Sequence, residues 1–289
     1  MSDLLPEIRE ICRLCDIKPA RSKGQNFLVN ERIYDDIVAA AEIKADDIIL
    51  EVGPGLGFLT LKLAKQAERV IAVELDDKLA DYLQTGIAAK DIKNIEIVNE
   101  DILRFNLGHY LKSSEEYKIV ANLPYNITSI FLRIFLSSPQ PPQSLILMLQ
   151  KEVAERIVAT PPKMNLLALA VQYYAEAKIV REVKAGNFWP EPKVDSAVIK
   201  IEVKKHAPAH SQTLKNQLIK DKQFFRLAKI AFSAKRKMLK NNLASGLKID
   251  QKIITELLIK NKFNPQLRAE DLSLEDWRKL FATFSEFMV

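Results

Sequence analysis

A glycine-rich run preceded by an acid is the first feature of the sequence that could hold a ligand. The run Glu51-Val-Gly-Pro-Gly-Leu-Gly57 follows a short apolar segment with the composition of a strand. Glycines at a strand-to-helix turn let the main chain turn tightly and approach a ligand closely. The next β-rich segment ends in Glu74, whose carboxylate can accept both ribose hydroxyls of an adenosine. These residues predict a site for an adenine nucleoside.

The spacing of the glycines discriminates between two classes of cofactor. The dinucleotide fingerprint is G-x-G-x-x-G, and its third glycine would fall on Phe58 in this chain. A carboxylate at Glu51 would repel a pyrophosphate, whereas it suits the sulfonium and ammonium groups of S-adenosylmethionine. The pattern therefore favours a methyl donor. A nicotinamide oxidoreductase is the disfavoured alternative, because no acid or base for a hydride site is evident either.

Asp101 follows the third β-rich segment and could form another corner of the same site. Its carboxylate can accept a hydrogen bond from an adenine amino group, although a lone aspartate after a strand commonly caps a turn. Ligands of open parallel sheets bind at the carboxyl ends of the strands. Gly53, Glu74 and Asp101 are therefore predicted to line one pocket.

The run Asn122-Leu123-Pro124-Tyr125 indicates the reaction. The exocyclic amine of adenine is a poor nucleophile, because its lone pair is delocalised into the ring. The side-chain oxygen of Asn122 and the carbonyl of Leu123 can accept both amino hydrogens, which favours a pyramidal, nucleophilic nitrogen. Pro124 keeps Leu123 out of the helical region, and Tyr125 can stack on the base. Methylation at such an amine needs in-line geometry but no general base.

An aromatic pair precedes the last predicted strand of this region. Phe188 and Trp189 are followed by two prolines, which stiffen the loop. Either ring could sandwich a base against Tyr125, provided that the base leaves its helix or already lies in a loop. The alternative is an aromatic plug that covers the edge of the sheet.

Alternating strands and helices must position these residues. Short β-rich runs alternate with helical stretches up to about residue 203, which predicts an α/β fold with a mainly parallel sheet covered on both faces. The last two strands have no long helix between them and should be antiparallel. Asn30 is the expected N-cap of one helix. The predicted strands span residues 48–52, 70–74, 95–98, 119–121, 145–149, 175–183 and 197–203.

The chain changes character after Val203. Residues 204–212 are polar and indicate a linker, and helical spacing follows over residues 224–243, 249–260 and 273–284. We therefore expect a domain with the sheet and the methyl-donor motifs over residues 1–204 and a small all-helical C-terminal domain over residues 205–289. The family resemblance given below implies a Rossmann-like class I methyltransferase for the first and rRNA binding for the second.

The positive charge is concentrated near this boundary. The chain carries a formal net charge of +6, whereas residues 204–245 alone hold eleven Lys or Arg and one acid. Such asymmetry indicates a polyanionic partner, although a solvated basic face is the plain alternative. We expect Lys235, Arg236 and Lys237 to lie on one basic helix that contacts phosphates. Arg21 and Lys23 could extend the same surface.

Composition excludes several other classes. The 289 residues are 48% hydrophobic and 28% charged, which is typical of a globular protein and not of a disordered one. Cys12 and Cys15 lack a second metal-binding pair, so we interpret them as reduced thiols on a short N-terminal helix and expect no metal. No apolar run approaches the ~20 residues that span a bilayer, and no secretory signal is evident. A cytoplasmic protein without a membrane partner is expected.

Taken together, the motifs resemble those of the 16S rRNA adenine dimethyltransferase family, ribosomal RNA small subunit methyltransferase A, whose relatives include the Dim1 enzymes and the erythromycin-resistance methyltransferases. The resemblance covers nearly the whole chain. Its departures lie in residues 163–168, in Lys23 and in residues 234–237, away from the donor motifs. The residues that carry it are Gly24-Gln-Asn-Phe-Leu28, Glu51-Val-Gly-Pro-Gly-Leu-Gly57, Glu74-Leu-Asp76, Asp101, Asn122-Leu-Pro-Tyr-Asn126, Gln150-Lys-Glu-Val-Ala-Glu-Arg156, Pro192-Lys-Val-Asp-Ser-Ala197 and Arg236-Lys-Met-Leu-Lys-Asn-Asn-Leu243.

The resemblance implies a specific activity. It implies that S-adenosylmethionine, converted to S-adenosylhomocysteine, dimethylates N6 of two adjacent adenosines in the 3′-terminal hairpin loop of 16S rRNA. The implied partner is a precursor of the small (30S) ribosomal subunit, with a role in subunit biogenesis, and the implied state is a monomer. The resemblance alone assigns Asn26 and Leu28 to the donor site. The motif spacing and the resemblance both assign to it Gly53, Glu74, Asp101 and Asn122.

Two alternatives to this activity stay open at the level of sequence. One is a catalytically weak RNA-binding assembly factor, against which the intact motifs at Glu74, Asp101 and Asn122 argue. The other is a resistance-type 23S rRNA adenine methyltransferase, which usually carries Asn-Ile-Pro-Tyr where this chain has Asn-Leu-Pro-Tyr.

Overall fold

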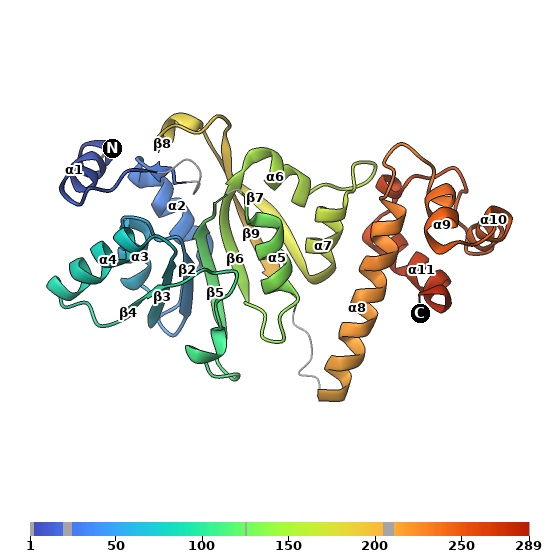
Figure 1. The fold of residues 1–289 in the computed structure, drawn as a ribbon, viewed down its shortest axis with the longest axis horizontal. Coiled ribbons are helices and arrows are strands. Elements are labelled where there is room, and N and C mark those ends of the chain that lie inside the picture. Colours follow the sequence, from blue (N-terminus) through green and yellow to red (C-terminus); the bar gives the residue numbers. More distant parts are fainter. Residues whose placement is uncertain (1–2, 20–24, 125, 205–210, 289) are drawn as a thin grey trace. The chain divides into compact units, whose positions relative to one another are not determined.

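Apolar strands covered on both faces form the centre of the fold, as the sequence predicts. The computed structural model describes residues 3–19, 25–124, 126–204 and 211–288 (Figure 1). Every residue of the strand at Ile48–Val52 is buried, including Glu51, which explains why its apolar residues show no alternation with polar ones. The strands are β2 (Ile48–Val52), β3 (Arg69–Glu74), β4 (Ile95–Asn99), β5 (Tyr117–Asn122), β6 (Ser144–Gln150), β7 (Ala175–Val183) and β9 (Ser196–Val203).

These strands form one seven-stranded sheet in the order β4-β3-β2-β5-β6-β9-β7. The five strands from β4 to β6 are parallel, and β9 pairs antiparallel with both β6 and β7. The predicted sheet and its antiparallel end are thereby confirmed. The strand order reverses at β2, so that the chain continues from β2 to β3 on one side and β5 pairs with β2 on the other side. At this place an open parallel sheet leaves a crevice beyond its strand ends.

Helices cover this sheet. α2 packs against β5, β6 and β9, whereas α3 and α4 pack against β3. Asn30 caps α2 as expected, since its side chain accepts a hydrogen bond from the Arg32 amide at 3.2 Å. Cys12 lies buried in α1, and it and Cys15 are free thiols. The helices are α1 (Leu5–Leu14), α2 (Glu31–Ala41), α3 (Phe58–Ala64), α4 (Asp77–Ala89), α5 (Thr128–Leu136) and α6 (Lys151–Ile157), with short 3-10 turns at Leu107–His109 and Ala185–Asn187.

A two-stranded ribbon joins distant parts of the sequence. β1 (Phe27–Leu28) pairs antiparallel with β8 (Phe188–Trp189), so that Phe27 faces Trp189 and Leu28 faces Phe188. The segment around Leu28 is further fixed by Tyr34, whose hydroxyl donates to the Leu28 carbonyl at 3.1 Å. This ribbon holds residues 25–28 next to the carboxyl ends of the central strands.

Two compact units make up the chain. Unit 1 comprises residues 1–155 and 175–204, and unit 2 comprises residues 156–174 and 205–289. One boundary coincides with the expected domain boundary at residue 204, whereas residues 156–174, placed in the first domain from sequence, cluster with the C-terminal helices. The reason is packing: Ala168 and Leu169 lie in the apolar core that Phe224 and Trp277 also share. The assignment of functions to these units stays a prediction.

The helices of unit 2 are α7 (Leu166–Tyr174), α8 (Ser211–Ala231), α9 (Leu239–Leu247), α10 (Gln251–Lys260) and α11 (Leu274–Phe284), with 3-10 turns at Ala269–Asp271 and Ser285–Phe287. Asp221 of α8 ties α8 to α7, because its carboxylate accepts hydrogen bonds from the hydroxyls of Tyr173 and Tyr174 at 2.8 and 2.9 Å. The described part of α8 begins at Ser211, inside the predicted linker, whose residues 205–210 lie outside the described ranges.

The prediction of one continuous helix over residues 224–243 is wrong. α8 ends at Ala231 and α9 begins at Leu239, with turns between them. The buried side chain of Asn242 donates to the carbonyls of Ala231 and Ala234 at 2.6 and 3.1 Å. It thereby satisfies carbonyl groups that the end of α8 leaves without intrahelical partners, so the chain can turn there.

Among the described residues, no helix is long and apolar enough to cross a bilayer. Within the same described ranges, no group of three or more His, Cys, Asp or Glu side chains is placed to hold a metal ion.

Candidate active site

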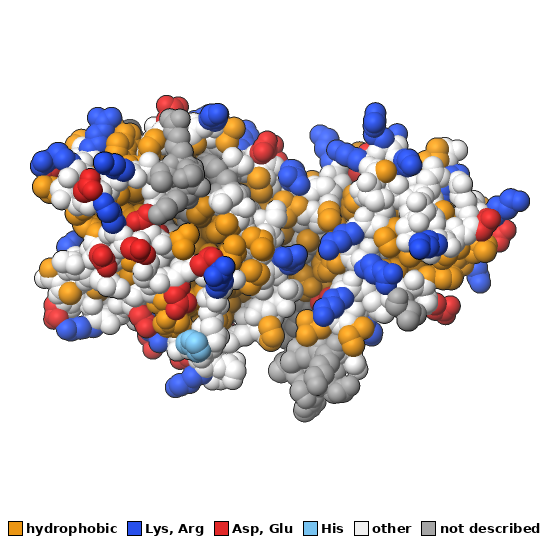
Figure 2. Space-filling view, viewed as in Figure 1, with side chains coloured by type: hydrophobic (Ala, Val, Ile, Leu, Met, Phe, Trp, Pro, Cys, Tyr) orange, Lys and Arg blue, Asp and Glu red, His pale blue; other side chains and the backbone are white. Residues whose placement is uncertain are grey.

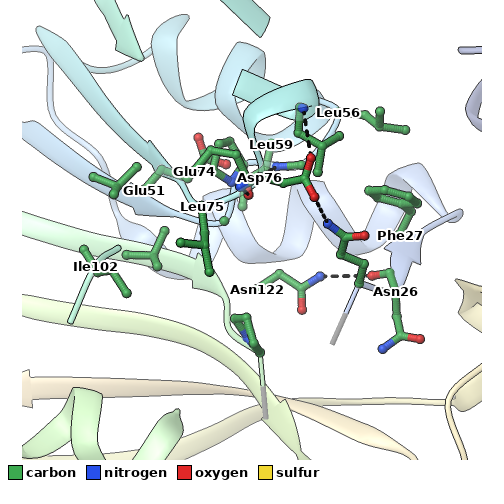
Figure 3. A pocket seen from close by; sticks show the side chains of 18 of the residues that line it. Asn26, Phe27, Glu51, Leu56, Leu59, Glu74, Leu75, Asp76, Ile102 and Asn122 are labelled. Carbon is green, nitrogen blue, oxygen red and sulfur yellow. Dashed lines mark hydrogen bonds between the residues drawn. The ribbon is translucent and has the colours of Figure 1, made fainter. Parts of the chain in front are cut away.

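A cavity of about 250 Å³ opens at the carboxyl ends of β2, β3 and β5 (Figure 3). It is lined by Gly53, Glu74, Asp101 and Asn122, which the sequence argument placed together, and also by Asn26 and Leu28. These residues come from four strand ends and from the β1 segment, and β2 and β5 run parallel in register. The topology of the sheet is therefore what gathers them.

The glycine turn shapes one wall of the cavity. Gly53, Gly55 and Gly57 all adopt positive φ angles of 66°, 61° and 83°. Such angles strain any residue with a Cβ atom, and a Cβ on Gly57 would also lie 2.5 Å from Leu83. The turn brings the Gly55 amide to within 3.1 Å of Glu74 Oε2, to which it donates.

Main-chain amides fix the orientation of the Glu74 carboxylate. Besides the Gly55 amide, the amide of Asp76 donates to its Oε1 atom at 2.9 Å. Only 6% of Glu74 is exposed, and this burial raises the pKa of its carboxyl group, against the effect of the two amides. A rigid, buried carboxylate of this kind suits the paired hydroxyls of a ribose.

Glu51 adds a second buried carboxyl group to the cavity wall. It is 1% exposed, and burial together with the nearby Glu74 carboxylate raises its pKa to about 8, against the lowering effect of the Thr60 hydroxyl. Its Oε2 atom has no hydrogen-bond partner among the described residues. A buried acceptor oxygen close to the Glu74 carboxylate fits a cationic nucleoside such as S-adenosylmethionine better than a pyrophosphate.

Asp101 caps a turn and also lines the cavity, whereas its predicted contact with an adenine amine stays a prediction. Its Oδ1 atom accepts a hydrogen bond from the Leu103 amide at 2.9 Å and so caps a turn. The side chain is 37% exposed and lies 4.0 Å from the exposed Arg104 guanidinium. It also lines the cavity, which leaves its second oxygen close to where an adenine amine could bind.

Asn122 ends β5 with its side chain at the cavity. Its Nδ2 atom donates to the main-chain carbonyl of Asn26 at 3.4 Å, an interaction visible in Figure 3. With the amide nitrogen engaged in this way, the Oδ1 atom is the group available as an acceptor. The contact joins the segment that borders the donor site to the residue predicted to hold the target amine.

The rest of the Asn122-Leu123-Pro124-Tyr125 run is only partly placed at the cavity. Pro124 lines it. Leu123 is 1% exposed and is not part of the cavity lining. Its amide donates to the Met148 carbonyl at 3.3 Å, which extends the β5–β6 pairing. Tyr125 lies outside the described residues, so its predicted stacking role stays a prediction.

The aromatic pair of β8 lies away from the cavity lining. Phe188 is 4% exposed and packs in the core of the sheet, where it faces Leu28. The Arg9 guanidinium lies over the Trp189 ring, 5.8 Å from the centre of that ring. This arrangement matches the alternative of an aromatic plug, and the stacking role assigned to Phe188 stays a prediction.

The predicted basic residues of unit 2 lie in a turn and not on a helix. Lys235, Arg236 and Lys237, here called the basic turn, are exposed between α8 and α9. Their position follows from the helix break at Ala231. Lys235 lies 3.9 Å from Glu270, and Figure 2 shows further Lys and Arg side chains over this part of the chain. Arg21 and Lys23, the other predicted RNA contacts, lie outside the described residues.

Some residues of the cavity were given no role of their own from sequence. Asp76 caps α4, and its Oδ2 atom accepts a hydrogen bond from Gln25 at 3.2 Å across the cavity rim (Figure 3). An aspartate directly before a helix is a recognisable signal for this role. Leu75 is 60% exposed and Ile102 is buried, and both offer apolar surface at the cavity. Nothing in the local sequence distinguishes them from other apolar residues.

Comparisons with known proteins identify the family. The family model described as ribosomal RNA adenine dimethylase matches residues 18–286. A protein of Dehalococcoides mccartyi (strain CBDB1) named ribosomal RNA small subunit methyltransferase A is 42% identical over 277 residues, 96% of this chain and 92% of its own length. A protein of the same name from Alkaliphilus oremlandii is 37% identical over 275 residues, 93% of each chain.

Solved structures agree with this assignment. The crystal structure of a dimethyladenosine transferase from Plasmodium falciparum matches with a TM-score of 0.76 and 26% identity, over 90% of this chain and 98% of that one. The structure of the 23S rRNA methyltransferase ErmE matches with a TM-score of 0.69 and 25% identity, over 90% and 100%. On the family match and these relatives, the chain belongs to the ribosomal RNA adenine dimethylase family.

Proposed function

We propose that this protein transfers methyl groups from S-adenosylmethionine to N6 of two adjacent adenosines in the 3′-terminal hairpin loop of 16S rRNA. The observation that carries the proposal is the meeting of Glu74, Asp101 and Asn122 at one cavity. The names of the relatives support the small subunit as the target.

Different residues of the cavity bind the methyl donor and the target base. Bound S-adenosylmethionine supplies an electrophilic methyl group. Glu74 is held by two main-chain amides, so its carboxylate is preorganised for ribose hydroxyls. Asp101 accepts from the adenine amine of the donor. The glycine turn lets the main chain approach the ligand without a side chain in the way.

Asn122 acts on the target base. Its Oδ1 atom accepts a hydrogen from the N6 amine and thereby favours the pyramidal geometry in which the nitrogen lone pair can attack. The contact between Nδ2 and the Asn26 carbonyl favours the orientation of the side chain that leaves Oδ1 as the acceptor. The proton lost from the amine passes to solvent, so the step requires orientation more than acid–base chemistry.

The natural substrate of this reaction is a precursor of the small (30S) ribosomal subunit, and the protein acts in subunit biogenesis as a cytoplasmic monomer. The concentration of positive charge over residues 204–245 supports the assignment of unit 2 to rRNA binding, with the basic turn as one contact. A 23S rRNA target is disfavoured, because the relatives with the higher sequence identity are named for the small subunit.

The proposal is tested with labelled S-adenosylmethionine and small subunits from cells that lack the modification. After digestion of the RNA to nucleosides, label is expected in N6,N6-dimethyladenosine. Mature small subunits, already modified, and unmodified large subunits serve as controls and should take up none. Label in large-subunit RNA would overturn the assignment of the target. Binding of small subunits without any label would overturn the catalytic proposal in favour of an assembly factor.

A further inference from the structure

The ribbon of β1 and β8 is too short to be stable through its own strand pairing. Each strand has two residues, yet the ribbon contains Leu28 and adjoins Asn26, both of which line the cavity. An isolated pair of strands is marginally stable in water even when it is longer than this one. The position of this wall of the cavity therefore depends on contacts beyond the two strand pairs.

Two asparagines provide such a contact at one end of the ribbon. Nδ2 of Asn30 donates to Oδ1 of Asn187 at 3.0 Å, and both residues are half-buried. In the main chain beside them, the Val29 amide donates to the Asn187 carbonyl at 2.8 Å. This pair of side chains, here called the asparagine bridge, closes the ribbon next to the pair of Leu28 and Phe188.

A second contact orients each amide of the asparagine bridge. Oδ1 of Asn30 accepts from the Arg32 amide at 3.2 Å, where it caps α2, so that its Nδ2 atom is directed to Asn187. Nδ2 of Asn187 donates to the Lys184 carbonyl at 3.1 Å, so that its Oδ1 atom is directed to Asn30. Donor and acceptor are therefore matched in advance, which lowers the entropic cost of forming the bridge.

Asp195 fixes the turn that carries Asn187. It belongs to the run Pro192-Lys-Val-Asp-Ser-Ala197, to which the proposed chemistry gives no role. Its carboxylate accepts from Nζ of Lys184 at 2.8 Å and from the Ala185 amide at 3.0 Å. These hydrogen bonds hold the pKa of Asp195 below its usual value, so the carboxylate stays charged at neutral pH. Asn187 is thereby held in a fixed place relative to β9, which begins at the next residue, Ser196.

Resting on the proposed function, we propose that Asn30 and Asn187 are positioning residues for the methyl donor. Their bridge holds the ribbon closed before the donor binds and so keeps Asn26 and Leu28 at the cavity. Without the bridge, the ribbon is open in a larger share of the free molecules. Binding of the donor must then close it, and the apparent affinity falls in proportion to the closed fraction. The bound donor restores the geometry, so the transfer step itself is unaffected.

Two single variants and their combination test this role. Asn187→Ala removes the acceptor, whereas Asn30→Ser keeps a good helix cap but is too short to reach Asn187. We expect each to weaken binding of S-adenosylhomocysteine by about 3- to 10-fold in calorimetry, the effect of one hydrogen bond. KM for S-adenosylmethionine should rise by the same factor, while kcat with saturating small subunits stays within twofold. The double variant should be no weaker than the weaker single variant.

Hydrogen exchange measures the closing of the ribbon directly. In the free Asn30→Ser variant, the Val29 amide should exchange faster than in the wild type by about the factor lost in affinity, and S-adenosylhomocysteine should restore its protection. Asn94→Ala is the matched control. The Asn94 side chain donates to the carbonyls of Ala64 and Ala67 at 2.8 and 3.1 Å in the same unit, outside the cavity lining. Its loss should lower stability and leave donor affinity unchanged.

Several results would overturn the inference while leaving the proposed donor intact. They are unchanged affinity in both single variants, losses that multiply in the double variant, and a lower kcat with an unchanged KM. If Asn187→Ala does not fold, Asn30→Ser decides by affinity and exchange. If the wild type binds neither S-adenosylmethionine nor S-adenosylhomocysteine, the proposed function fails, whereas exchange in the free protein still shows whether the bridge closes the ribbon.

Discussion

The packing of α8 against α9 allows a sharp prediction, because a single glycine sets their separation. Gly246 lies in α9, and a Cβ atom built there would sit 2.2 Å from Ile230 Cγ2 and 3.1 Å from its Cβ and Cγ1 atoms. Gly86 lies in α4, where an added Cβ would meet no atom within 4 Å. The two glycines therefore form a matched pair with opposite expectations on substitution by alanine.

Gly86→Ala should stabilise the protein by about 0.5–1 kcal/mol, since alanine loses less backbone entropy in a helix. The same gain applies to Gly246→Ala, but overpacking costs about 1–3 kcal/mol. Ile230 is β-branched and restricted to essentially one rotamer in a helix, so its methyl group cannot swing away. The cost should lie at the upper end of that range, and the net loss should be about 2 kcal/mol.

Urea unfolding measures both effects. The chain has two tryptophans, and Trp277 is fully buried in unit 2. In a Trp189→Phe background, its fluorescence reports on unit 2 alone, where Gly246→Ala acts. Gly86→Ala is followed by circular dichroism of the whole chain. Because α8 and α9 flank the basic turn, Gly246→Ala should also weaken RNA binding, while donor affinity stays unchanged.

A second substitution tests the cause. In an Ile230→Ala background, which removes the two nearest side-chain atoms apart from Cβ, Gly246→Ala should cost less than about 0.5 kcal/mol. If Gly246→Ala alone is as stable as the wild type, the helices separate without cost and the argument from close packing is refuted. An equal loss in both backgrounds would place the strain elsewhere than at Ile230.

Three further predictions concern the active site, the RNA surface and the fold. Asn122→Ala should lower single-turnover methylation by at least about 100-fold, with a smaller loss of donor affinity by calorimetry, and wild-type turnover would contradict the mechanism. Reversing the three charges of the basic turn should make the salt dependence of RNA binding weaker, so that the slope of log association constant against log salt becomes less steep by about 2–3. An unchanged slope would place the RNA surface elsewhere. Lys118 donates to Asp47 at 2.7 Å, with the two side chains only 10% and 13% exposed. Lys118→Met should therefore cost about 3 kcal/mol in urea unfolding, because it leaves Asp47 with the Lys44 amide as a partner but without a cation, and a loss below about 1 kcal/mol would show that the pair adds little.

The sequence by itself determined the sheet and the cluster of donor residues. Strand positions follow from local apolar runs bounded by turn residues, and β2 spans Ile48–Val52 as predicted. The meeting of Gly53, Glu74 and Asn122 follows from topology alone, because parallel strands present their carboxyl ends at one edge. Both arguments need only local pattern and a general rule of α/β folds.

Other features were decided by contacts between residues far apart in the sequence. The break after Ala231 depends on Asn242, whose side chain replaces the missing helical hydrogen bonds, and helical spacing alone does not reveal it. Burial of Phe188 depends on its pairing opposite Leu28 in a ribbon that joins distant segments. The buried surroundings of Glu51 likewise arise only when Glu74, Thr60 and Tyr34 fold around it. Local sequence specifies the elements, whereas the environment of each side chain is a property of their packing.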